Sequence, residues 1–106
     1  MDYTAGPSNN MGYLMAIEKL MAIDEEIPLR AKLLRTAVAE LSRLASHHIW
    51  IGTHAFDLGA MSAFLWSLRE REKILYLFEQ ACGARLTTSF MRVGGTGPHD
   101  VPESWI

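Results

Sequence analysis

The stretch from Glu40 to Glu72, ELSRLASHHIWIGTHAFDLGAMSAFLWSLRERE, decides the fold of this chain. It is typical of the end of one long helix, a break marked by Gly59, and the start of the next helix. At about 100° per residue, the first of these helices collects on one broad apolar arc Leu34, Val38, Leu41, Ala45, His48, Ile49, Gly52, Ala55 and Phe56. A narrower polar ribbon on the opposite side collects Glu40, Arg43, His47, His54 and Asp57. The stretch therefore predicts a wide buried face and an ordered polar ribbon.

A first helix is predicted upstream, over about residues 9–23. Three favoured N-cap residues stand at its start: Ser8, Asn9 and Asn10. Apart from Glu18 and Lys19 this helix is apolar on every side, and such a helix is normally surrounded by protein. Part of its surface is therefore expected to face something absent from this chain.

The second helix is predicted over about residues 28–58, with Pro28 suited to its first turn and Gly52 as a weak interruption. The third is predicted over about residues 62–82, with Ser62 as its N-cap and Gly83 as its left-handed terminator.

The end of the chain has no clear periodicity. Leu86 to Val93 fits either a short strand or a helical turn, and the tail beyond it is irregular. The sequence thus predicts an all-α fold, in which three main helices form part of a helical bundle with an irregular C-terminal tail. Residues 1–106 are expected to be a single helical fragment of a larger subunit.

Composition excludes several function classes. Lys and Arg number 10 against 12 Asp and Glu, which gives no electrostatic footprint for nucleic acid or an anionic membrane. No apolar run approaches the roughly 20 residues of a membrane span. The single cysteine, Cys82, excludes an internal disulfide and a multi-cysteine metal cage.

The histidines of the second helix have two interpretations. His48 lies on the apolar arc, where a histidine is most often neutral and satisfied by a neighbour. His54 and Asp57 are three residues apart and are able to share a ligand or a proton. With His47 they supply two or three metal ligands at most, so no metal site is expected. The alternative is a solvated polar face.

Asp57 and Arg71 carry charge in apolar surroundings. Asp57 stands near the end of a helix, where the dipole disfavours a carboxylate, and burial there would disfavour the charge further. Both effects would make it a candidate proton carrier. Arg71 falls on the apolar face of the third helix, so a structural ion pair is expected. The available partners are Glu18, Glu40 and Asp57.

A family resemblance covers nearly the whole chain, in order and with matching spacing. It is carried by Met1-Asp2-Tyr3, Asn10, Tyr13, Ala16 to Leu20, Pro28, Arg30-Ala31, Arg35, Glu40 to His47, Asp57 to Met61, Arg69 to Glu72, Gly83 to Arg85, Arg92 and Gly94-Gly95. On these residues the chain resembles an internal segment of the D subunit of NADH-quinone oxidoreductase. That is the quinone-site subunit of respiratory complex I, and it is similar in fold to the large subunit of nickel–iron hydrogenases.

The resemblance implies roles for individual residues. Tyr3 matches the tyrosine that hydrogen-bonds the quinone head group, and its partner histidine lies upstream of this segment in the family. Asp57 matches the acid that relays charge or protons after quinone reduction, and is the implied catalytic residue. The implied supporting charged scaffold comprises Arg43, His47, His54, Arg71 and Arg85. Arg85 also falls in the family stretch that faces the iron–sulfur subunit. Hydrogenases place a nickel motif near the position of Asp2 to Ala5, where this chain has no cysteine.

The implied function is that of a subunit of a proton-translocating NADH:quinone oxidoreductase, contributing to the quinone pocket and the proton path. Its place is the peripheral arm of an electron-transport complex, on the cytoplasmic side of the cell membrane. Quinone is the substrate, while NADH and the iron–sulfur clusters are bound by partner subunits, so this chain is expected to bind no cofactor. The isolated segment is expected to be inactive and to self-associate. The alternative is a non-catalytic helical scaffold module of a hydrogenase-like complex.

Overall fold

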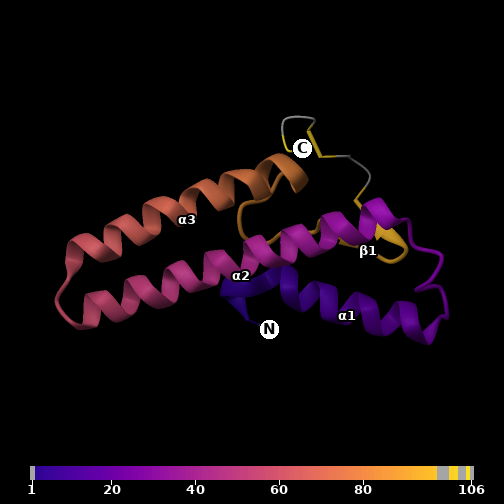
Figure 1. Cartoon of the computed structure of the whole chain (residues 1–106), viewed down its shortest axis with the longest axis horizontal. Helices are drawn as coiled ribbons and strands as arrows, with labels where there is room; N and C mark the ends of the chain where they lie inside the picture. Colours follow the sequence, from indigo (N-terminus) through magenta and orange to yellow (C-terminus); the bar gives the residue numbers. More distant parts are fainter. Residues whose placement is uncertain (1, 98–100, 103–104, 106) are drawn as a thin grey trace.

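The computed structural model describes residues 2–97, 101, 102 and 105. Their elements follow in the order η1 (Tyr3–Ala5), α1 (Gly6–Leu20), α2 (Leu29–Asp57), α3 (Met61–Cys82), β1 (Met91–Arg92) and β2 (Gly95–Thr96). Helices α2 and α3 form a long antiparallel hairpin, and α1 runs back along the first half of α2 (Figure 1). The expectation of a helical fold with three main helices and an irregular end is confirmed. Residues 98–100, 103–104 and 106 of the predicted tail lie outside the described part.

Helix α1 begins three residues earlier than predicted, because Pro7 occupies its first turn. The expected caps are therefore wrong: Asn9 and Asn10 lie inside the helix. The Asn9 side chain donates to the carbonyl of Ala5 at 3.0 Å, and that of Asn10 donates to the carbonyl of Thr88 at 3.2 Å. Asn10 therefore ties α1 to the segment that follows α3.

Helix α1 also ends earlier than predicted, because Ala22 adopts a left-handed φ of 57°. The N–H of Ile23 donates to the carbonyl of Glu18 at 3.1 Å, and that of Ala22 donates to the carbonyl of Lys19 at 3.2 Å. These two bonds form a Schellman motif, which closes the helix before Ile23. This motif is not predictable from the sequence, because its left-handed position holds alanine in place of glycine.

The ends of the other two helices follow their glycines. Gly59 (φ 85°) closes α2 and Gly83 (φ 74°) closes α3, as predicted. Two start positions differ from the prediction. Pro28 lies at the N-cap position of α2, and Ala60, not Ser62, caps α3 without a side-chain hydrogen bond. Helix α3 therefore begins at Met61, one residue before Ser62, and the residue at its cap position has no polar side chain.

Gly52 does not interrupt α2; it is where α3 approaches most closely. A Cβ at Gly52 would lie 3.1 Å from Ser67 Cβ and 3.3 Å from Phe64 Cδ2. The Ser67 hydroxyl donates to the carbonyl of His48 at 2.8 Å across the same contact. The absence of a side chain at Gly52 therefore lets the two helices of the hairpin touch.

The core lies between the three helices and the segment after α3. It comprises Leu14, Val38, Ala45, Ile74, Leu75, Phe78, Ala81, Phe90, Met91 and Val101. Met91 pairs with Thr96 and Arg92 with Gly95 in a small antiparallel hairpin, so the strand alternative holds for the end of the 86–93 segment. The predicted apolar arc of α2 is buried at Val38, Ala45 and Gly52, but Phe56 at its end is 49% exposed.

Large apolar side chains remain exposed on α1 and on the α2–α3 hairpin. On α1 the exposed fraction reaches 88% at Leu20, and Tyr13 and Met15 are also exposed. Trp50 and Trp66 are exposed on the hairpin. This agrees with the expectation that part of α1 faces a surface outside the chain. Among the described residues, no helix combines the length and the apolar character that crossing a membrane requires.

Candidate functional site

Three of the predicted site residues line one small cavity, although they are far apart in the sequence. Tyr3 comes from η1, Arg71 from α3 and Arg85 from the segment after α3. The complete lining is Tyr3, Thr4, Gly6, Pro7, Ser42, Ala45, Arg71, Leu75, Phe78, Arg85 and Leu86. The packing of η1 and α3 against the middle of α2 brings these residues together.

Tyr3 is held by the turn in which it lies. The carboxylate of Asp2 accepts hydrogen bonds from the N–H of Thr4 at 3.0 Å and from the Thr4 hydroxyl at 2.8 Å. These bonds cap η1 and fix the backbone of Tyr3 between them. Tyr3 itself is 70% exposed, so its phenol is free to meet a ligand that approaches from outside the described part of the chain.

Arg71 does not form the expected ion pair. Glu18 binds Arg35, Glu40 binds Arg43, and Asp57 is exposed at the far end of α2. Arg71 is half-buried, and its Nε is a buried atom with no hydrogen-bond partner among the described residues. The prediction of a carboxylate partner from these three is wrong within this part of the chain, because each carboxylate is held by a nearer arginine or lies too far along α2.

Arg85 is exposed and bridges two acidic residues of α3. Its guanidinium pairs with Glu72 and, at 3.7 Å, with Glu79. These pairs hold the segment after α3 against that helix. Exposed pairs of this kind contribute little to stability, so they serve to orient Arg85.

The polar ribbon of α2 is a solvated face. Arg43, His47, His54 and Asp57 are all exposed, and the hydrogen bond from Arg43 lowers the pKa of Glu40. Because Asp57 is exposed, the burial that would make it a proton carrier is not present within the described residues. No group of three or more His, Cys, Asp or Glu side chains in the described ranges is arranged to hold a metal.

Asp57 and Tyr3 are not brought together. The cavity beside Tyr3 includes Ser42, and Asp57 lies 15 residues further along the same helix. At a rise of 1.5 Å per residue, this corresponds to about 22 Å. The two residues to which the resemblance assigns the main roles are therefore far apart: Tyr3 of η1 packs beside the middle of α2, and Asp57 is the last residue of that helix.

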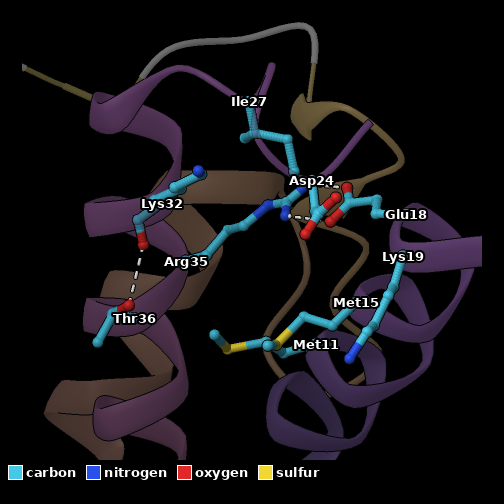
Figure 2. Close-up of a pocket in the computed structure, with 9 residues that line it drawn as sticks. All are labelled: Met11, Met15, Glu18, Lys19, Asp24, Ile27, Lys32, Arg35 and Thr36. Carbon is cyan, nitrogen blue, oxygen red and sulfur yellow. Dashed lines mark hydrogen bonds and ion pairs between the residues drawn. The ribbon is translucent and has the colours of Figure 1, made fainter. Parts of the chain in front are cut away.

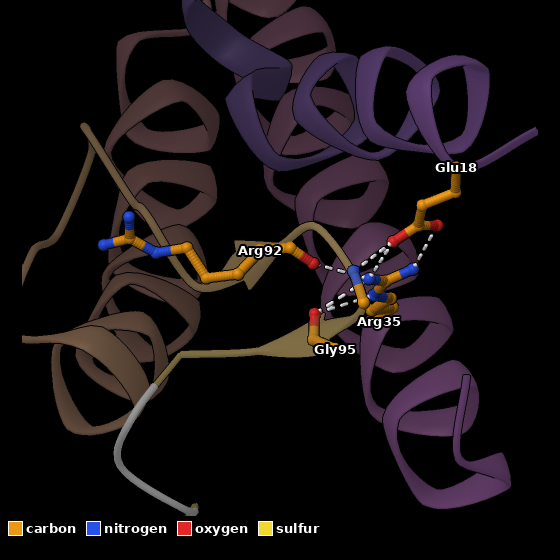
Figure 3. A network of polar contacts seen from close by, with 5 residues as sticks. Glu18, Arg35, Arg92 and Gly95 are labelled. Atoms are coloured by element: carbon orange, nitrogen blue, oxygen red, sulfur yellow. Dashed lines mark hydrogen bonds and ion pairs between the residues drawn. The ribbon is translucent and has the colours of Figure 1, made fainter. Parts of the chain in front are cut away.

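Among the described residues the most buried charges are Glu18 and Arg35, a pair that the sequence did not predict. Arg35 Nη1 and Nη2 donate to the two oxygens of Glu18 at 2.9 and 2.6 Å, and both side chains are almost fully buried. Arg35 also donates to the carbonyls of Arg92 and Gly95, while the N–H of Gly94 donates to Glu18 (Figure 3). The hydrogen bonds from Arg35 hold the pKa of Glu18 below its usual value against the opposing effect of burial.

One pattern in the sequence points to Arg35. The buried positions of α2 follow alternating steps of four and three: Ala31, Arg35, Val38, Ser42 and Ala45. This is the spacing of a seam between packed helices, and it places Arg35 inside the seam. A guanidinium there requires a buried carboxylate, and Glu18 is the charge on the otherwise apolar part of α1.

A larger cavity of about 430 Å³ lies beside this pair, between α1 and α2. Its lining is Met11, Met15, Glu18, Lys19, Asp24, Ile27, Lys32, Arg35 and Thr36 (Figure 2). Met11 and Met15 reach across from α1 toward α2. None of the predicted site residues lines it. Its two most buried charges are satisfied by each other, so the cavity presents a flexible apolar wall with charged groups at its rim.

Comparison with known proteins gives consistent relatives. The family described as "Respiratory-chain NADH dehydrogenase, 49 Kd subunit" matches residues 57–106. The D subunit of NADH-quinone oxidoreductase from a Nitratiruptor species is 50% identical over all 106 residues, which are 26% of its own length. The protein of the same name from Campylobacter jejuni is 52% identical over all 106 residues, 25% of its length. The D subunit numbered 2 from Thermodesulfovibrio yellowstonii is 55% identical over 95 residues, 90% of this chain and 23% of the relative. The chain thus spans about a quarter of the length of the curated relatives it matches.

Proposed function

Because this chain belongs to the family of the D subunits of NADH-quinone oxidoreductase, we propose that the protein carrying it is a subunit of a proton-translocating NADH:quinone oxidoreductase. In this proposal NADH is oxidised in partner subunits, and electrons reach quinone from an iron–sulfur cluster of the neighbouring subunit. The subunit lies in the peripheral arm of the complex, on the cytoplasmic side of the membrane. This chain contributes one wall of the quinone pocket and part of the proton path.

The observation that carries the proposal is the meeting of Tyr3, Arg71 and Arg85 around one cavity. A quinone carbonyl oxygen becomes negative as it is reduced, and a phenol O–H aimed at it stabilises that charge. Tyr3 is the exposed donor, and Arg71, which forms no ion pair among the described residues, places positive charge beside it, whereas the charge of Arg85 is offset by Glu72 and Glu79. The electron-donating cluster belongs elsewhere, because iron–sulfur clusters require several cysteines and this chain has one.

The role proposed for Asp57 is to carry a proton further along α2. With Asp57 about 22 Å from the level of the cavity, a direct transfer is excluded, so other groups must relay the proton. His54 and His47 lie on the same ribbon, one and three helical turns nearer to the cavity. The proposed path therefore follows the polar ribbon, once the remainder of the longer protein covers it.

The second candidate is a helical scaffold without a catalytic role. It is favoured by the exposure of Arg43, His47, His54 and Asp57, which share no pocket among the described residues. It differs from the first candidate in one measurable respect: changes at Tyr3 and Asp57 would then leave quinone reduction unaffected.

The decisive test is Tyr3→Phe in the assembled complex. The change removes one hydrogen bond aimed at developing charge, which is worth about 2–4 kcal/mol, so quinone-reductase activity should fall by roughly ten- to a thousand-fold. Tyr13→Phe is the matched control, because Tyr13 is also largely exposed but does not line the cavity. Activity is normalised to iron–sulfur content. Near-normal rates and quinone affinity in Tyr3→Phe would reject the assignment in favour of the scaffold.

A further inference from the structure

We propose that a single water molecule binds in the cavity beside Tyr3 and bridges Ser42 Oγ of α2 to Arg71 Nε of α3. This site is a structural hydration site at the junction of η1, α2 and α3. The inference does not depend on the proposed function, since it rests on hydrogen-bond requirements within the chain.

The first argument is that two buried polar atoms of this cavity have no partner. Ser42 is 1% exposed, and neither its hydroxyl oxygen nor Arg71 Nε has a hydrogen bond to any described residue. Both residues line the same cavity. Buried polar groups are nearly always hydrogen-bonded to protein or to ordered water, because an unpaired one loses its hydration without compensation.

The second argument comes from the other hydroxyl groups of α2. Those of Thr36, Ser46 and Thr53 each bond a carbonyl of their own helix, at 2.9, 2.8 and 2.9 Å. Ser42 is the hydroxyl of α2 that makes no such bond and lines the cavity. Because a serine hydroxyl donates one hydrogen bond and accepts others, a water in the cavity satisfies it in either direction.

The third argument is the size of the cavity. It leaves about 10 Å³ for the centre of a water molecule, which is close to what one water needs and less than a carboxylate needs. Ala45, Leu75 and Phe78 form an apolar part of its wall. The water accepts a hydrogen bond from Nε of the charged Arg71 guanidinium and donates one to Ser42 Oγ, and both of these protein atoms are buried.

The test is a structure of the full-length protein in its complex, at a resolution that shows buried waters. The expected result is one solvent peak within about 2.7–3.2 Å of both Ser42 Oγ and Arg71 Nε. The peak should weaken or disappear in Ser42→Ala and persist in Ser46→Ala. The control removes a hydroxyl one turn further along α2 that bonds its own helix.

Three results would overturn the proposal: an empty cavity where other buried waters are visible, a direct protein partner for Ser42 Oγ, or a side chain from elsewhere filling the space. If Ser42→Ala does not assemble, the wild-type map decides by itself. Thermal unfolding adds an independent readout. Ser42→Ala should lower the unfolding midpoint if the hydroxyl holds a water, and raise it if the hydroxyl is an unpaired buried group.

Discussion

Replacing Glu18 by glutamine measures how firmly the buried ion pair joins α1, α2 and the β1–β2 hairpin. Glu18→Gln keeps the shape of the side chain but leaves the guanidinium of Arg35 buried without a counter-ion. Removing one partner of a buried pair costs about 3–5 kcal/mol. Arg35 keeps its bonds to the carbonyls of Arg92 (2.6 Å) and Gly95 (2.9 Å), so the expected loss in the free energy of unfolding is about 3 kcal/mol.

The assay is urea denaturation of the 106-residue chain at neutral pH and fixed concentration, followed by circular dichroism. Glu18→Gln should lower the midpoint and leave the slope unchanged. Glu40→Gln is the matched control, because Glu40 pairs with Arg43 in the same way but the two side chains are 55% and 54% exposed. If both variants lose the same small amount of unfolding free energy, water reaches the Glu18–Arg35 pair and the expected strength of the buried pair is refuted.

The pH dependence of the same variant gives a second check. The pKa of Glu18 is lowered in the folded chain, mainly by the hydrogen bonds from Arg35. At a pH between the folded and the unfolded pKa, the unfolded state therefore binds more protons than the folded state. The contribution of Glu18 is complete above the usual glutamate pKa of about 4.3 and is lost as pH falls through the lower folded value. The difference between wild type and Glu18→Gln should therefore shrink in acid. A difference that grows as pH falls below about 4 would contradict this assignment.

Further changes test the helix ends, the hairpin and the proton path. Ala22→Gly should stabilise the 106-residue chain by up to about 1 kcal/mol in thermal unfolding, because it removes the strain of a left-handed alanine; a loss would show that Ala22 is relaxed. Gly12→Ala should also stabilise it by about 1 kcal/mol, since an added Cβ there meets nothing within 4 Å. Gly52→Leu should destabilise it by about 1–3 kcal/mol, since even a Cβ there would lie 3.1 Å from an α3 side chain. If Gly52→Leu were instead more stable than Gly12→Ala, α2 and α3 would be free to separate. Asp57→Asn in the assembled complex should impair proton-coupled turnover more than assembly, while the exposed Asp24→Asn should not; equal effects would remove Asp57 from the path.

Helix number and the closing of the hairpin were predictable because they depend on local chemistry. Apolar residues at steps of three and four mark the buried face of α2, and Gly59 and Gly83 supply the left-handed residues that end α2 and α3. The family resemblance selected Tyr3, Arg71 and Arg85, which the structure then places around one cavity. The same resemblance selected Asp57, which the structure leaves exposed and distant from them.

The start and end of α1 were less predictable because several local solutions compete. Asn9 and Asn10 are good caps in isolation, but Pro7 begins the helix before them and their side chains bond other carbonyls. Ala22 ends the helix in a conformation that alanine seldom adopts. Differences of about 1 kcal/mol decide such positions, and long-range packing outweighs them.

The sequence alone determines three helices, the turn that closes the α2–α3 hairpin and the resemblance to the D subunits. Only the tertiary structure decides which charges are paired. Glu18, Glu40 and Asp57 are all possible partners for Arg71 by residue type, yet Glu18 of α1 lies against Arg35 of α2. A buried charge needs a buried counter-ion, because an uncompensated one is strongly destabilising, and which charges are buried together depends on which helix faces meet. Periodicity describes one helix at a time, so it does not contain the distance between side chains on two different helices.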